Sequence, residues 1–195
     1  MMIHSPVRSG VVFLSVALLL SLFTPSRSAR ATTLMRMSIA QVSRTAPVIV
    51  RARCVGNSVG WDAGEIWTFT SFDVEEVWRG PAPARVVVRL LGGRLGNITS
   101  SVSGVPRFRA DEEVVLFLEP TPRGDFSVVS WQQGTFRIRP GARTGEESVV
   151  QDTASFATFD PDTHRFQVTG VQGLSLESFR ARVDAALREE PGRTQ

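Results

Sequence analysis

Residue types that carry chemistry are scarce in this chain. Cysteine occurs once, at Cys54, so no disulfide can form within the chain. Histidine occurs only at positions 4 and 164, and lysine does not occur at all. A serine or cysteine nucleophile in the body of the protein would therefore need His164 as its base. Because G-x-S-x-G, H-E-x-x-H and nucleotide-binding glycine motifs are also missing, the sequence predicts no catalytic residues, no metal and no cofactor.

Long hydrophobic runs are missing as well. The longest, residues 11–23, covers about 13 residues, whereas a membrane-spanning helix needs roughly 20. It follows Arg8 and precedes Ala29-Arg30-Ala31, which has small residues at the two positions that a signal peptidase reads. We therefore expect residues 1–31 to be a cleaved export signal. The mature chain would begin near Thr32 without a membrane span, in the periplasm or outside the cell.

Excess positive charge is absent once that segment is set aside. All 22 basic residues are arginines, and three of them lie in the expected signal. The 19 that are left are matched by 19 acidic residues. A nucleic-acid-binding domain concentrates positive charge on one face. The balance of charges therefore argues against nucleic acid as a partner.

The body of the chain is a succession of β-branched and aromatic segments separated by Gly, Pro and Asp, a pattern typical of a mainly β domain. About 164 residues are enough to bury one core. We expect a single β-barrel domain over 32–195, in which 141–195 is a hairpin-plus-helix extension. The expected strands are 48–55, 66–78, 85–91, 113–120, 126–131 and 135–140, with turns at 56–58 and 79–83.

A short helix is expected near each end of this domain. Ser38 and Gln41 form a capping box, S-I-A-Q, and Pro47 ends the helix that follows. Ser175 is suited to cap a second helix, whose apolar residues fall on one face that would pack on the barrel. Between the barrel and this helix, residues 157–168 predict a hairpin with its turn at 160–163. Its D-x-D-x-H string could also suggest a metal, although Asp and Pro at these positions favour the turn.

The segment FDVEEVWRGP raises the question whether Glu75 and Glu76 are a catalytic pair. Adjacent residues of a regular strand point to opposite faces, so their carboxylates could not converge on one bond. The apolar alternation also breaks here, because Phe72 and Val74 are followed by Val77, as in a β-bulge. We therefore expect both glutamates to face solvent at a bend in the strand.

The order of strands between residues 47 and 118 resembles that of a known module. PVIVRARCVG, FTSFDVEEVWRGP, RVVVRL and DEEVVLFL are similar to the netrin-like module, the OB-type barrel of tissue inhibitors of metalloproteinases, netrins and complement proteins. The order is also similar to that of a group of exported bacterial proteins. The resemblance implies a five-stranded Greek-key barrel and a role in binding. Inhibition does not carry over, because the zinc-chelating cysteine at the mature N-terminus has no counterpart near Thr32.

The predicted barrel leaves two loops, 56–65 and 92–111, as candidate binding surfaces. Arginine and exposed aromatic residues are enriched in interface hot spots. The candidate partner-binding residues are Trp61, Arg94, Arg107, Phe108 and Arg109. The alternative is that Trp61 and Phe108 pack on the barrel while the arginines are only solvated.

The function predicted from these observations is that of an exported, non-enzymatic binding module for a protein partner. We expect the module to be a monomer or to self-associate weakly. Two other functions stay open. One is a small secreted hydrolase with a carboxylate-based site, since carboxylates need no motif. The other is a structural component of the cell envelope, which would self-associate through Cys54 or the C-terminal helix. Cys54 shares a strand face with apolar residues, which favours a buried thiol.

Overall fold

The computed structural model describes residues 35–140, 146–151, 158–167 and 170–189; the expected signal, 1–31, lies outside them. The strands are β1 (Val48–Asp62), β2 (Glu65–Arg79), β3 (Arg85–Leu91), β4 (Gly93–Leu95), β5 (Ile98–Ser100), β6 (Glu113–Pro120), β7 (Phe126–Val128), β8 (Thr135–Pro140), β9 (Glu147–Gln151), β10 (Thr158–Asp160), β11 (Arg165–Gln167) and β12 (Leu174–Ser175). The helices are α2 (Ile39–Thr45), the 3-10 helix η1 (Trp131–Gly134) and α3 (Leu176–Arg188). No helix among these described residues is long and apolar enough to cross a membrane.

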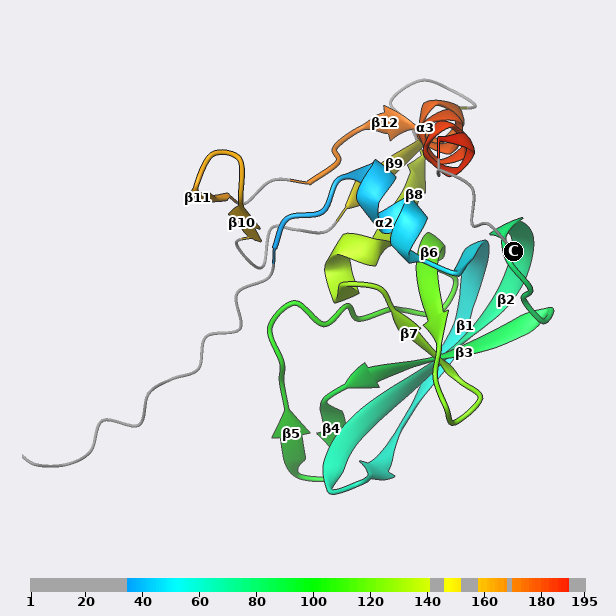
Figure 1. The fold of residues 1–195 in the computed structure, drawn as a ribbon. Coiled ribbons are helices and arrows are strands. Elements are labelled where there is room, and N and C mark those ends of the chain that lie inside the picture. The colour runs from blue at the N-terminus through cyan, green and yellow to red at the C-terminus, as the bar shows by residue number, and fades with distance from the viewer. Residues whose placement is uncertain (1–34, 141–145, 152–157, 168–169, 190–195) are drawn as a thin grey trace, which may run out of the picture. The chain divides into compact units, whose positions relative to one another are not determined.

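The main sheet closes on itself in a Greek-key barrel. Its strand order is β1-β2-β3-β7-β6-β8-β9-β12, and β1 also pairs with β6. The strands β1, β2, β3, β7 and β6 therefore form a ring (Figure 1), in which β3 and β7 are parallel and the other pairs are antiparallel. The fold is mainly β with a helix near each end, as the sequence predicts, although the ring is not evenly closed.

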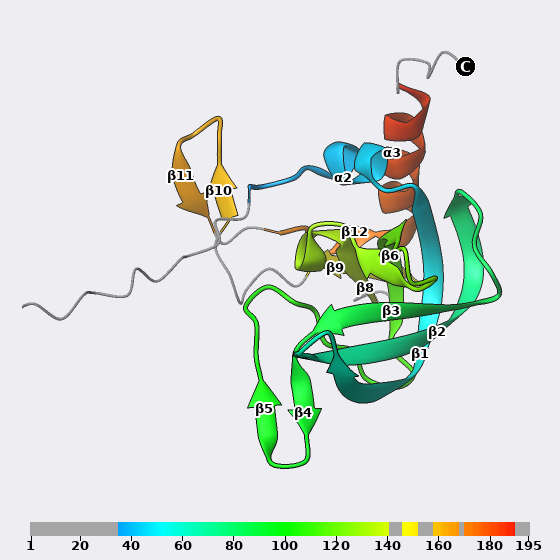
Figure 2. The same cartoon turned by 60° about the horizontal axis from the view of Figure 1, so that its bottom comes forward.

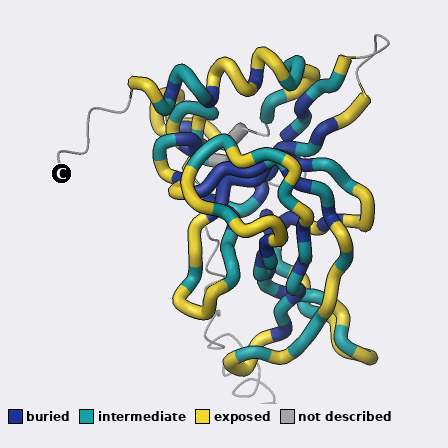
Figure 3. The backbone as a smooth tube through the Cα atoms, turned by 90° about the vertical axis from the view of Figure 1, so that its right-hand side faces the viewer, coloured by how far each residue is buried: buried dark blue, intermediate teal, exposed yellow. Residues whose placement is uncertain are grey.

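Alternation along β1 and β6 builds two hydrophobic cores, one on each face. Even-numbered residues of β1 and β6 fill the barrel, as predicted for the face that includes Cys54: Val48, Val50, Ala52, Cys54, Val114, Leu116 and Leu118. The odd-numbered residues Ile49, Val115 and Phe117 face a second core beneath the helices. Figure 3 shows that the buried backbone is concentrated in the middle of the molecule. Because β6 is buried on both faces, it reads as a continuous apolar run.

The two helices cover the second core and lie side by side (Figures 1 and 2). The predicted capping box at Ser38 begins α2, and the side chain of Ser175 caps α3. Phe179 of α3 is fully buried, with its ring centroid 4.6 Å from that of Phe136 on β8. Burying one such side chain contributes about 1.5–3 kcal/mol. The helices therefore pack on the sheet, as the apolar face of α3 predicts.

The predicted turn at 56–58 is wrong, and so is most of the predicted loop 56–65. β1 continues through these residues and pairs with β2 up to Asp62, and the turn lies at Ala63 and Gly64, which have positive φ. Gly-Asn-Ser has the composition of a turn, but a register shift after Cys54 bends the strand without ending it. The side-chain amide of Asn57 donates to the carbonyl of Phe108 at 2.9 Å, which links the bent strand to the connection 92–111.

Two other connections also differ from a simple loop or strand. The long connection 92–111 contains the β4–β5 hairpin, which projects from the ring in Figure 2. The predicted strand 126–131 ends at Val128, because Ser130 and Trp131 have positive φ and lead into η1. The turn predicted at 160–163 is confirmed, since β10 and β11 pair across it. There the carboxylate of Asp160 accepts the backbone N–H groups of Asp162 and Thr163.

Candidate functional site

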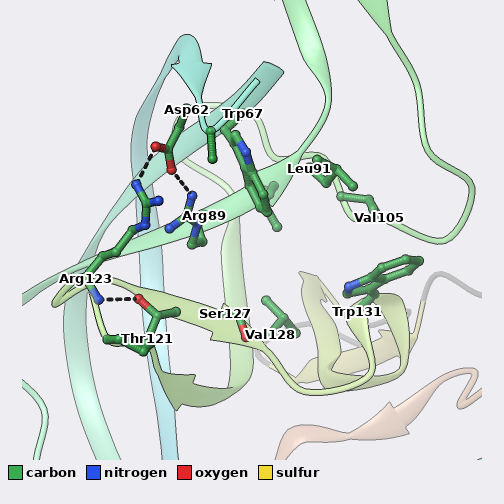
Figure 4. A pocket seen from close by; sticks show the side chains of 13 residues that line it. Asp62, Trp67, Arg89, Leu91, Val105, Thr121, Arg123, Ser127, Val128 and Trp131 are labelled. Atoms are coloured by element: carbon green, nitrogen blue, oxygen red, sulfur yellow. Dashed lines mark hydrogen bonds and ion pairs between the residues drawn. The ribbon is translucent and has the colours of Figure 1, made fainter. Parts of the chain in front are cut away.

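A pocket lies at the seam where the barrel closes least well. β1 and β6 pair from Val48↔Leu118 to Arg53↔Glu113, whereas β3 and β7 pair only at Val88↔Phe126. Next to that single pair lies a cavity of about 490 Å³, here called the seam pocket. Its apolar wall is formed by Trp67, Leu91, Val105, Val128 and Trp131. Its polar side, on the left in Figure 4, is formed by Asp62, Arg89, Thr121 and Arg123.

Strand alternation places an aromatic residue beside an arginine in this pocket. Ile66 and Thr68 of β2 are buried, so Trp67 lies on the opposite face of the strand. On the neighbouring strand Leu91 is paired with Trp67, and Arg89 comes two residues before it on the same face. The guanidinium carbon of Arg89 lies 4.2 Å from the centre of the Trp67 ring. This cation–π contact holds the arginine flat against the wall of the pocket.

The charges at the polar side form a closed ion-pair network. The side chain of Arg89 is only 9% exposed; it donates to Asp62 and lies 3.7 Å from an oxygen of Asp125. Arg123 also donates to Asp62 (Figure 4). The hydrogen bonds from Arg89 and, to a lesser extent, Arg123 lower the pKa of Asp62. Two arginines thus face two aspartates, and the buried guanidinium is compensated.

Two buried N–H groups in the pocket wall have no acceptor. Among the described residues, none accepts a hydrogen bond from the indole N–H of Trp67 or from Nε of Arg89. A buried donor without a partner costs about 1–3 kcal/mol. An oxygen atom that reached this stacked pair would remove that cost. The wall of the pocket therefore combines an apolar surface with two covered donors, which an acceptor would reach only after a small movement of the wall.

Trp131 is held over the pocket by strained backbone. Ser130 and Trp131 have φ of 51° and 54°, a region that residues other than glycine rarely adopt. The buried Gln133 stabilises the bend: its amide donates to Ser130 Oγ at 2.9 Å and to the carbonyl of Met35 at 2.8 Å. Strain of this kind costs about 1–3 kcal/mol per residue and is concentrated at functional sites.

The structure separates the five residues predicted to bind a partner. Trp61 is 58% exposed and neighbours Asp62 in sequence, but it does not line the seam pocket. Arg94 lies on the β4–β5 hairpin. Arg107 donates to the carbonyl of Leu91 at 3.0 Å, and it shares one cavity with Arg94 and another with Arg109.

Phe108 follows the alternative that the sequence left open, in which it packs on the barrel. Its side chain is only 6% exposed and packs edge-on against Phe72 in the barrel, with 5.0 Å between ring centroids. A phenylalanine within a polar loop gains more from entering the nearby core than from facing water. Phe108 therefore anchors the loop, and the arginines on either side of it stay at the surface.

Glu75 and Glu76 also differ from their predicted arrangement. The predicted bulge is present, because Arg51 pairs with Glu76 while Ala52 already pairs with Val74. The extra residue turns both carboxylates to the same side, where they lie 3.3 Å and 3.8 Å from the guanidinium of Arg51. Alternation does not hold across a bulge, so the two carboxylates share a side of the strand; both remain partly exposed at the bend, as the sequence predicts. They are ion-pair partners of a half-buried arginine.

The residues of the seam pocket were missed by reasoning from the sequence. Trp67, Arg89 and Trp131 come from three separate segments that only the closed barrel brings together. One signal was present: Trp67 and Phe69 alternate with buried residues on β2 and so had to point away from the barrel core. Large aromatic residues at outward positions often mark a binding surface.

Comparison with protein-family models finds no match for this chain. No curated protein matches it either. The seam pocket must therefore be interpreted from its own chemistry.

Proposed function

We propose that this protein is an exported, non-enzymatic binding module that holds a segment of a protein partner in the seam pocket. The observation that carries the proposal is the pairing of an apolar wall with buried N–H donors that have no acceptor among the described residues. An apolar side chain of the partner would cover Trp67 and Trp131. A carbonyl oxygen next to it would accept from the stacked tryptophan and arginine. Export and membership of the netrin-like group belong to the same proposal.

Binding is favoured over hydrolysis by the state of the carboxylates. A catalytic acid needs a raised pKa so that it carries a proton near neutral pH. The pKa of Asp62 is instead lowered, mainly by the hydrogen bond from Arg89. A carboxylate held ionised by two arginines is suited to fixing the positions of those arginines. This supports a recognition site.

A protein partner is favoured over a sugar by the lining of the pocket. Sugars present hydroxyl groups around the whole ring and need polar contacts on several sides. Here the charged residues lie on one side, and tryptophan, leucine and valine form most of the rest. The position of the pocket, although not the class of ligand, agrees with the fold, because OB-type barrels bind oligonucleotides and oligosaccharides on strands 2 and 3 and at the adjacent loops. In this chain those parts correspond to β2, β3 and the turns at 63–64 and 121–125.

The test is a comparison of two tryptophan variants in a binding assay. The purified protein is immobilised, a retained partner is identified from the exported fraction of the source cells, and its affinity is then measured by calorimetry. Trp131→Ala should weaken binding at least about tenfold, because hot-spot tryptophans contribute about 2 kcal/mol or more. Trp61→Ala removes an exposed tryptophan outside the pocket and should leave the affinity unchanged.

The reverse result would overturn the assignment of the site. If Trp61→Ala abolished binding and Trp131→Ala did not, the surface predicted from the sequence would be the binding site. If the exported fraction gave no partner for the wild type, the binding-module proposal itself would fail. The intact mass of the protein from source cells tests export separately, since it should correspond to a chain that begins near Thr32.

A further inference from the structure

Two short segments carry arginines on either side of a buried apolar residue. Residues 107–109 read Arg-Phe-Arg and residues 137–139 read Arg-Ile-Arg. Phe108 is 6% exposed and Ile138 is 7% exposed, so both point into the protein. The arginines on either side of them therefore point outward. All four arginines border one cavity of about 380 Å³, here called the arginine cavity.

Negative charge in the arginine cavity is scarce. Among its described lining residues, Glu112 is the one carboxylate against four guanidinium groups. Glu112 accepts from Arg137 and from the backbone N–H of Arg109 at 3.0 Å, and it lies 3.8 Å from Arg139. One glutamate thus holds the site together without neutralising it.

The arginines differ in how firmly they are held. Arg137 is 11% exposed, donates to the carbonyl of Arg107 at 2.6 Å and lies over the Phe108 ring at 5.4 Å. Arg107 donates to the carbonyl of Leu91, and no carboxylate among the described residues lies within ion-pair distance of it. Burial lowers the pKa of Arg107, and no acid offsets that effect. Arg107 is nevertheless exposed, so its guanidinium is open to an anion from solvent.

The neighbouring cavity directs an anion to one side. Arg109 and Arg139 also border a cavity that contains Asp111, Glu113, Glu146 and Glu147. Glu113 and Glu147 are already paired there with Arg51, at 3.1 Å and 3.0 Å. An anion is therefore repelled from that side and drawn toward Arg107.

We infer that the arginine cavity binds a tetrahedral oxyanion, namely a phosphate or sulfate group, either free or as a monoester. Guanidinium groups match such oxygens with two parallel hydrogen bonds each. In this site Arg107 and Arg109 would donate hydrogen bonds to the anion directly. Arg139 would contact it from the solvent side, and Arg137, which is held in place by Glu112, would lie beneath it. Of their described lining residues, the site and the seam pocket share only Val105, and the site needs no partner protein to be tested.

The experiment is a titration of the whole protein followed by ¹H–¹⁵N spectra that include the arginine Nε–Hε signals. The probes are sodium phosphate, sodium sulfate and phenyl phosphate, with ionic strength held constant by sodium chloride. Saturable shifts at Arg107 and Arg109 are expected. The double variant Arg107→Gln, Arg109→Gln should bind at least about tenfold more weakly, because each lost charge-assisted hydrogen bond weakens binding by about that factor or more. Arg182→Gln, an exposed arginine of α3, is the matched control and should bind as the wild type does.

Each outcome decides the inference. Saturable binding of phenyl phosphate alone would assign the site to an ester group, whereas equal binding of inorganic phosphate would assign it to the free ion. Shifts that grow linearly and equally with chloride would indicate charge screening only and would overturn the inference. Unchanged affinity in the double variant would also overturn it. If that variant does not fold, Arg109→Gln alone provides the same comparison, because Arg109 lies between β5 and β6, outside the described helices and strands.

Discussion

The two seams of the barrel are closed in opposite ways. At the β1–β6 seam the strands pair continuously, and most of the paired residues belong to the two apolar cores. At the β3–β7 seam one residue pair joins the strands, and next to it lies a buried ion pair between Arg89 and Asp62. The first seam provides stability. At the second seam the two strands are mostly not paired, and charged residues, tryptophans and residues with strained backbone surround a pocket. A binding site can form there.

The difference implies that mutations at the two seams should have different consequences. A change at an apolar residue of the β1–β6 seam should reduce stability, since these side chains fill the two cores. A change at the β3–β7 seam should reduce stability by a smaller amount, but it should weaken the affinity for the partner more strongly. Such a trade-off is common at sites that are strained for function.

The largest effect is expected for Phe117→Ala at the closed seam. Phe117 is fully buried and contacts the rings of Phe136 and Phe179. Removing it should lower the free energy of unfolding by about 3–5 kcal/mol, because a cavity is left behind. Urea unfolding measures this. Val55→Ala, at an exposed position of β1, should change stability by less than about 0.5 kcal/mol. Similar losses for both variants would contradict the proposed core.

A smaller loss of stability is expected for Arg89→Met at the open seam. The change removes a buried charge but leaves Asp62 paired with Arg123, so unfolding should become easier by about 2 kcal/mol. Binding of the partner should be lost, since the stacked guanidinium is gone. Urea unfolding and calorimetry on the same sample test both parts. Full affinity in this variant would show that the seam pocket is not the binding site.

The sequence predicted the parts of the fold that depend on local patterns. The cap at Ser38, the buried face with Cys54 and the bulge near Glu75 all follow from residues within a few positions of one another. The prediction of a turn at Gly56-Asn57-Ser58 was wrong because local composition cannot show that β2 continues to pair with β1 through these residues. The seam pocket was not predicted for a similar reason: Trp67 and Arg89 come together only when β2 and β3 pair in the observed register.

The dependence of stability on pH should be weaker in Asp62→Asn. Arg89 and Arg123 lower the pKa of Asp62 in the folded protein, so the unfolded chain binds more protons near its own pKa of about 3.9. This contribution is complete above that pH and is lost as pH falls through the lower, folded-state pKa. Urea midpoints measured from pH 7 to pH 2 should therefore fall less steeply in the variant below about pH 4. An identical slope would show that the ion pair does not stabilise the seam.

The smallest effect is expected for Glu76→Gln on the outer face of the bulge. Arg51 retains Glu75, Glu113 and Glu147 as partners, and Glu76 is half exposed. The free energy of unfolding should change by less than about 1 kcal/mol, as for other exposed ion pairs. Thermal unfolding at low and high salt measures it. A loss as large as that of Arg89→Met would mean that the bulge, and not the seam, holds the charged network together.

The single cysteine makes barrel opening measurable in the unmodified protein. Cys54 is 1% exposed, and its backbone bonds to Asp111 and Glu112 where the chain enters β6. An alkylating reagent can reach the thiol only when β1 and this segment separate, and burial also raises the pKa of the thiol and keeps it protonated. The ratio of its alkylation rate to that of an unfolded peptide gives the fraction of molecules that are open. A ligand that binds only the closed barrel would slow alkylation in proportion to its occupancy, and this provides an assay that needs no engineered label.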